Sequence, residues 1–146
     1  MKIKYWIDEK FKEPELLICA DQKTKEVEKI REKIAETLSV SIIGYTTSGA
    51  ELLSCNDIIR IYAEGERVYA ECKNGVYTLK KKLYEMEQNL PEEEFVRISR
   101  AELVNVHKIK RLYTGMTGTI KMYLQGDIET YVSRRNVGRI KVVLHI

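Results

Sequence analysis

Apolar residues recur at helical spacing in one early part of the chain, residues 24–38. They follow one another at steps of three and four with charged residues between them, which is the pattern of an amphipathic helix. The apolar positions are Val27, Ile30, Ile34 and Leu38. Asp21 or Thr24 can cap the start of this helix. A segment this small cannot bury the stripe alone, so we expect it to pack on the rest of the chain or on a second copy.

Two short segments before this helix predict strands. Residues 2–7 alternate loosely between polar and apolar positions, residues 16–20 form a short apolar run, and Glu13-Pro14 marks a turn between them. Residues 1–40 are therefore predicted to form a β-β-α extension. We hypothesise that this extension mediates dimerisation.

Beyond residue 40 most segments have the length and the β-branched and aromatic content of short strands, separated by turn residues. The predicted strands are residues 40–45, 51–54, 58–63, 67–72, 76–79, 95–99, 103–106, 109–113, 119–124 and 129–132. Asn74-Gly75 predicts a two-residue hairpin turn with positive φ at both positions. Residues 81–89 predict one short helix that ends before Pro91, and residues 136–144 fit either a helix or a strand. The predicted fold class is mostly β (α+β overall), with a strand-rich domain over residues 41–146 after the β-β-α extension.

The composition limits the class and location of the protein. Hydrophobic residues make up 44% and charged residues 32% of the 146 positions, as in ordinary soluble proteins. No apolar run approaches the roughly 18 residues of a membrane span, and the N-terminus lacks a signal-peptide core. We therefore expect a cytoplasmic protein with no membrane partner. Cys19, Cys55 and Cys72 form no close pair, so we expect buried or half-buried free thiols and no metal site.

Charge is distributed unevenly along the chain. Residues 45–94 contain 6 Lys and Arg against 10 Asp and Glu, a net charge of −4. Residues 95–146 contain 10 against 3, a net charge of +7. Such a separation suggests one face suited to a polyanion.

Motifs for catalysis or nucleotide binding are lacking. The sequence contains no GxGxxG, phosphate-loop, HExxH or Gly-x-Ser-x-Gly motif. His107 and His145 are interpreted as surface or structural residues rather than general bases. The acidic run at residues 92–94 is interpreted as a solvated loop. We therefore expect no enzyme activity and no cofactor.

Four segments occur in the order and spacing of a known family. Residues 95–109, FVRISRAELVNVHKI, resemble the central motif F-x-R-x-H-R-S-x-x-V-N-x-x-x-I of the LytTR DNA-binding domain. Residues 57–70 resemble the early strand pair of that family, residues 83–91 its short helix, and residues 131–137 its Ser-Arg-Arg motif. Ser99 and Ala101 stand where the family usually has His and Ser. These departures bear on base preference more than on the fold.

The resemblance implies a bacterial transcription regulator that binds double-stranded DNA sequence-specifically through loops inserted into successive grooves. The loops correspond to residues 64–67, 99–100 and 133–136. The residues expected to read bases are Arg100, Arg135, Glu66 and Ser99. The residues expected to contact the DNA backbone are Arg67, Arg97, Lys108, Ser133, Arg134, Asn136 and Arg139. For Arg97, an ion pair with residues 92–94 is an equally weighted interpretation.

The resemblance also suggests how the protein assembles. Many relatives carry a receiver domain before this one, whereas residues 1–40 lack a receiver's acidic pocket and repeats. We expect a homodimer on paired repeat sites, where linked half-sites gain affinity. Two alternatives remain: a protein-interaction or anti-regulator module, suggested by Ser99 and Ala101, and a single-strand binder using the strand tyrosines. Cross-strand packing is the simpler interpretation of those tyrosines.

Overall fold

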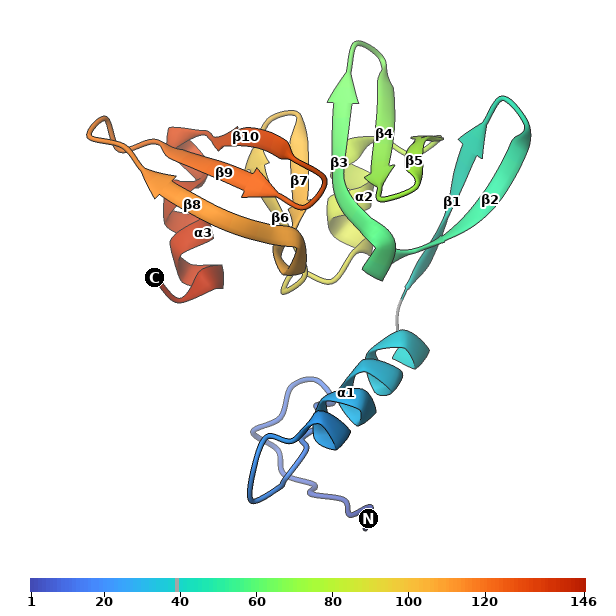
Figure 1. The fold of residues 1–146 in the computed structure, drawn as a ribbon, viewed down its shortest axis with the longest axis vertical. Coiled ribbons are helices and arrows are strands. Elements are labelled where there is room, and N and C mark those ends of the chain that lie inside the picture. Colours follow the sequence, from blue (N-terminus) through green and yellow to red (C-terminus); the bar gives the residue numbers. More distant parts are fainter. Residues whose placement is uncertain (39) are drawn as a thin grey trace. The chain divides into compact units, whose positions relative to one another are not determined.

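The chain divides after Leu38 into two compact units, which are described separately. The structure is a computed structural model that describes residues 1–38 and 40–146 (Figure 1). The first unit contains helix α1 (Lys25–Leu38), where the apolar spacing predicts it. Thr24 is its cap, because Thr24 Oγ1 accepts a hydrogen bond from the Val27 amide at 3.2 Å.

The two strands predicted before α1 are wrong. Residues 1–24, all of which the structure describes, form neither helix nor strand, so the extension is not β-β-α. A two-stranded hairpin is stable only when its apolar face is covered, and within the described residues Leu16 and Leu17 remain exposed. The apolar run at residues 16–20 therefore does not indicate a strand here.

The second unit is built from two antiparallel sheets, which confirms the mostly β class. The larger sheet has the order β2-β1-β5-β4-β3-β7-β6 and the smaller has the order β10-β9-β8. The strands of the larger sheet are β1 (Ser41–Thr46), β2 (Gly49–Ser54), β3 (Ile58–Glu64), β4 (Arg67–Cys72), β5 (Gly75–Leu79), β6 (Phe95–Ser99) and β7 (Glu102–Asn105). The strands of the smaller sheet are β8 (Ile109–Thr114), β9 (Ile120–Leu124) and β10 (Ile128–Val132).

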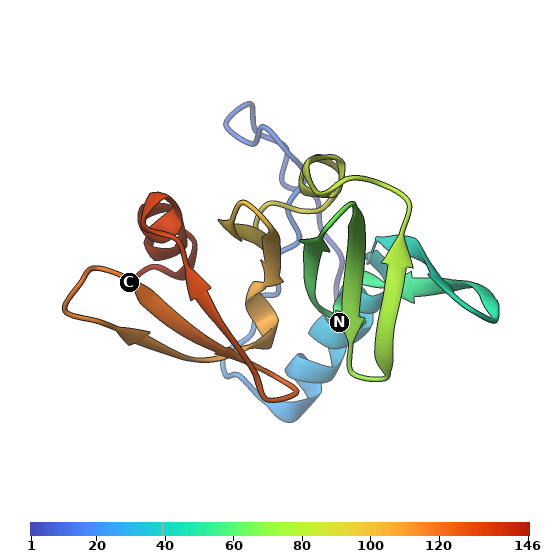
Figure 2. The ribbon, with the colours of Figure 1, turned by 90° about the horizontal axis from the view of Figure 1, so that it is seen from above.

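Two helices pack on these strands: the one predicted before Pro91, and a second in residues 136–144, the segment that fits either a helix or a strand by sequence. They are α2 (Leu83–Asn89), which contacts β3, β6 and β7, and α3 (Val137–Leu144), which contacts β6. Figure 2 shows β6 and β7 between the smaller sheet with α3 on one side and strands β3 to β5 on the other. No helix in the described parts of the chain has both the length and the apolar character needed to cross a bilayer.

The β6–β7 hairpin is shared by two hydrophobic cores. Side chains alternate between the two faces of a strand. On β6 Phe95 therefore joins the core that contains α2, while Val96 joins the core between the two sheets. On β7 Leu103 and Val104 divide in the same way. Packing on both faces fixes the position of this hairpin.

The β4–β5 hairpin is confirmed, but its turn differs from the prediction. Cys72 pairs with Gly75, so Lys73 and Asn74 form the turn. Among these residues only Gly75 has positive φ, at 149°, whereas the prediction required it at Asn74 as well. The strand register therefore moves the glycine just beyond the turn.

The three cysteines differ in environment. Cys55 and Cys72 are buried free thiols, as expected, whereas Cys19 is exposed. Burial raises the pKa of both Cys55 and Cys72 to about 11. The two buried thiols are thus protonated at neutral pH and behave as core residues.

Gly44 on β1 occupies a position with no room for a side chain. A Cβ there would lie 2.6 Å from Leu53 Cδ1 and 2.8 Å from Tyr77 Cβ. Gly44→Ala should therefore lower the free energy of unfolding in urea by about 1–3 kcal/mol, the usual cost of overpacking. The matched control is Gly138→Ala on α3, where no described heavy atom lies within 4 Å of the added Cβ. That change should raise stability by about 0.5–1 kcal/mol, and a similar loss at both glycines would contradict the packing at Gly44.

Candidate nucleic-acid interface

Two backbone hydrogen bonds bring the three predicted reading loops together. The Ala63 amide, at the end of β3, donates to the Ala101 carbonyl at 2.8 Å and joins the β3–β4 loop to the β6–β7 turn. The Ser133 amide, just after β10, donates to the Ile98 carbonyl at 2.8 Å and joins residues 133–136 to β6 just before the same turn. In Figure 1 the β3–β4 and β6–β7 tips point to the same side of this unit. The β6–β7 hairpin is thus bonded, at or just before its turn, to residues at the edge of both other loops, which come from distant parts of the chain.

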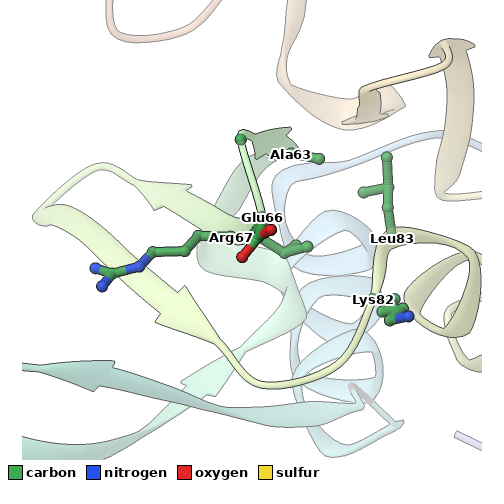
Figure 3. Close-up of a pocket in the computed structure, with 7 residues that line it drawn as sticks. Ala63, Glu66, Arg67, Lys82 and Leu83 are labelled. Atoms are coloured by element: carbon green, nitrogen blue, oxygen red, sulfur yellow. The ribbon is translucent and has the colours of Figure 1, made fainter.

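The β3–β4 loop is a tight turn with two charged side chains. Gly65 has a φ of 61°, as glycine does at the first central position of such a turn. Glu66 and Arg67 are exposed. A hollow of about 540 Å³ lies beside the loop, and its lining includes Lys82 and Leu83. Figure 3 shows the Arg67 side chain extending away from Lys82 and Leu83, so its guanidinium is not directed at them.

Arg97 fixes the shape of the β6–β7 turn. Its Nε donates to the Ser99 carbonyl at 2.7 Å and its Nη2 donates to the Arg100 carbonyl at 2.8 Å. Ser99 Oγ accepts a hydrogen bond from the Ala101 amide at 3.2 Å, which closes the turn from the other side. The Arg100 side chain itself is exposed. The backbone of the turn is therefore held while the Arg100 side chain extends from it.

Arg97 forms an ion pair within the protein, one of the two interpretations that the sequence offered, but with a different partner. Its Nη1 forms an ion pair with Glu87 on α2 at 3.0 Å, whereas the ion pair considered from the sequence was with residues 92–94. Three of its nitrogens are thus engaged, and its side chain is only 20% exposed. The phosphate contact of Arg97 stays a prediction, and the geometry makes Arg97 a support for the turn.

The segment at residues 133–136 is closed by its own side chains. Asn136 Nδ2 donates to Ser133 Oγ at 2.7 Å, and the Asn136 amide donates to the Ser133 carbonyl at 2.9 Å. Between these two residues Arg134 and Arg135 are exposed. Two adjacent guanidinium groups are therefore presented from a closed turn.

A buried carboxylate lies directly after the β6–β7 turn. Glu102 is 8% exposed and accepts hydrogen bonds from Arg60 Nη1 on β3 at 3.0 Å and from Thr130 Oγ1 on β10 at 2.6 Å. Arg60 also pairs with Glu71 on β4 at 2.6 Å. This network connects the two sheets behind the loops. Glu102 is one of only three acidic residues in the basic segment 95–146, a signal that could have identified it.

Asn105, at the end of β7, has a structural role. It is 2% exposed, and its Nδ2 donates to the Ile58 carbonyl at 2.9 Å. Its Oδ1 accepts from the His107 amide at 3.0 Å. The asparagine of the central motif therefore anchors the end of β7 and is not available to a ligand.

Residues 48–145, more than half of the chain, match the family of LytTr DNA-binding domains. The chain belongs to this family. An HTH-type transcriptional regulator of Staphylococcus aureus strain MSSA476 is 33% identical over 147 residues, covering 100% of this chain and 99% of its own length. A second one, from strain NCTC 8325, is 36% identical over 108 residues, covering 74% of this chain and 73% of its own length.

The fold of this LytTR domain matches a solved structure as well. The LytTr DNA-binding domain of a Bacillus cereus protein aligns with a TM-score of 0.70 at 24% identity, covering 73% of this chain and 97% of its own. Family membership confirms the prediction of a DNA-binding regulator rather than an enzyme. Although the relatives are named HTH-type, α2 and α3 of this LytTR domain are separated by five strands. Within the described residues no adjacent helix pair forms a helix-turn-helix.

Two predicted contacts with the DNA backbone, Lys108 and Arg139, lie outside the three LytTR loops themselves. Lys108 follows β7 at the end opposite the β6–β7 turn, and its carbonyl accepts from the Gln125 amide at 2.8 Å. Arg139 lies on α3 and pairs with Glu87 at 3.1 Å. The structure thus brings the predicted contacts of the three loops close together, whereas Lys108 lies at the opposite end of β7.

Proposed function

We propose that this LytTR protein is a transcription regulator that binds double-stranded DNA sequence-specifically and reads successive grooves with its three loops. The supporting observation is that two backbone hydrogen bonds join the loops, each of which carries an exposed arginine. Loops held at fixed spacing lose less conformational entropy on binding than mobile ones. A regulator of bacterial genes acts in the cytoplasm, where we place the protein.

The proposed base readers lie on all three loops. Arg100 and Arg135 are exposed and can each offer a two-pronged donor to guanine O6 and N7. Glu66 can accept from cytosine N4. Ser99 Oγ accepts a bond within the turn, so its hydroxyl hydrogen is available to a base acceptor.

Most of the proposed contacts with the DNA backbone lie on the same loops as the base-reading residues. Arg67 and Arg134 are exposed and suit phosphate oxygens, and Ser133 and Asn136 flank Arg134 on the same turn. Arg139 is 46% exposed and can contact a phosphate while it pairs with Glu87. Lys108 would contact the backbone only where the duplex reaches the far end of β7.

Substitutions of two adjacent arginines should separate base reading from phosphate contact. Arg135→Ala should reduce the preference for a selected duplex over random duplex by roughly 5- to 150-fold, equivalent to about 1–3 kcal/mol. Arg100→Ala should act in the same way. Arg134→Ala should weaken binding to all sequences and reduce the log–log salt slope by about 0.9. Fluorescence anisotropy with selected and random duplexes at two salt concentrations measures both quantities.

Lys73→Ala is the control for this experiment. It removes the same charge from the turn at the opposite end of β4 and should leave the sequence preference unchanged. If the wild-type protein prefers no duplex over random DNA at either salt concentration, the regulator function fails. The interaction-module alternative would then be the better account. Preference for single strands over duplex would instead support the single-strand binder.

We further propose that the protein binds paired repeat sites as a homodimer through the N-terminal unit. No residue of α1 among those described is buried within the chain, so Val27, Ile30 and Ile34 have apolar surface to cover. Ile34→Asp should convert a dimer to a monomer in sedimentation at micromolar concentration. If both the wild type and the variant sediment only as monomers, this dimer is excluded.

A further inference from the structure

One carboxylate on α2 pairs with arginines from two other elements, β6 and α3. Glu87 Oε2 lies 3.0 Å from Arg97 Nη1, and Glu87 Oε1 lies 3.1 Å from Arg139 Nη1. Arg97 lies on β6 just before the β6–β7 turn, and Arg139 lies on α3 just after the turn at residues 133–136. Both oxygens of Glu87 are therefore used to hold elements that carry proposed DNA contacts.

Through Arg97, this carboxylate acts on the turn that carries Arg100. With Nη1 on Glu87, the planar guanidinium places Nε and Nη2 on the carbonyls of Ser99 and Arg100. The side chains of Glu87 and Arg97 are 28% and 20% exposed, so water screens the pair less than it would at a fully exposed position. Without Glu87 the guanidinium loses the partner that sets its orientation.

We propose that Glu87 is a positioning residue for base discrimination, because it aims Arg97 at the β6–β7 turn and thereby sets the direction of Arg100. The inference rests on the proposed function. Glu87 carries a negative charge close to a surface proposed to meet phosphates, so by charge alone it opposes DNA binding. Loss of Glu87 should therefore lower discrimination without lowering affinity for random DNA, a combination that general structural damage does not produce.

Glu87→Gln tests this proposal in the full-length chain. The ratio of the Kd for random duplex to the Kd for the duplex selected by the wild type should fall about fivefold or more, the lower end for one bidentate base contact. The Kd for random duplex should stay the same or decrease. Hydrogen exchange of residues 97–102 without DNA should become faster, because the two carbonyls lose their fixed donor.

Two further variants serve as comparisons. Glu93→Gln removes the same charge from an exposed position in the loop before β6, and it should leave both the Kd ratio and the exchange of residues 97–102 unchanged. Arg97→Lys keeps the charge but cannot reach both carbonyls and Glu87 at once, so it should lower the Kd ratio as Glu87→Gln does. The effect is thus testable through Arg97→Lys if Glu87→Gln fails to fold.

The outcomes separate this inference from the proposed function. A wild type without sequence preference overturns both. A wild type with a clear preference, together with a Kd ratio that stays within about twofold in Glu87→Gln or Arg97→Lys, overturns the inference alone. Faster exchange of residues 97–102 with an unchanged Kd ratio also overturns it, because the turn would then be held by Glu87 without effect on reading.

Discussion

The carboxylate of Glu102 lies where the two sheets meet, and the geometry of the proposed reading face, the three loops at residues 64–67, 99–100 and 133–136, depends on it. It accepts hydrogen bonds from Arg60 on β3 and Thr130 on β10, and it begins β7 directly after the β6–β7 turn. A buried carboxylate is tolerated only while its oxygens keep their partners, so movement of one sheet against the other would leave it unpaired. Three loops from two sheets can act together because this contact, with the packing around β6 and β7, holds the sheets in place.

The arginines of this domain fall into two groups: some form ion pairs that hold the fold, and others are exposed to solvent. Acidic side chains, Glu87 and Glu102 among them, hold arginines in the partly buried layer behind the loops. The exposed arginines Arg100 and Arg135 extend beyond that layer. A pre-organised layer reduces the side-chain ordering that binding requires, and in the proposed function the outer arginines supply attraction and base recognition. The proposed DNA-binding surface is therefore built from turns and uses no recognition helix.

Much of the fold could be predicted from the sequence, because the alternation of polar and apolar residues and the residues typical of turns are local signals. The strands of the second unit, the helix before Pro91 and the family motif around Arg100 all follow from short-range patterns. The strands predicted at residues 2–7 and 16–20 fail because strand formation requires pairing partners that local sequence does not reveal. The scarcity of acidic residues in segment 95–146 marks Glu102 in the sequence, but its partners and those of Glu87 could not be predicted, because only the fold brings these carboxylates against their arginines.

Hydrogen exchange of the full chain, free and bound to its selected duplex, tests most directly whether the three loops form one DNA-reading face. The account predicts slower exchange on binding at residues 64–67, 99–101 and 133–136 together, while the hairpin tips at residues 46–49 and 73–75 are unchanged. Protection of only one of the three loops, or protection at residues 73–75 without the β6–β7 turn, would contradict it.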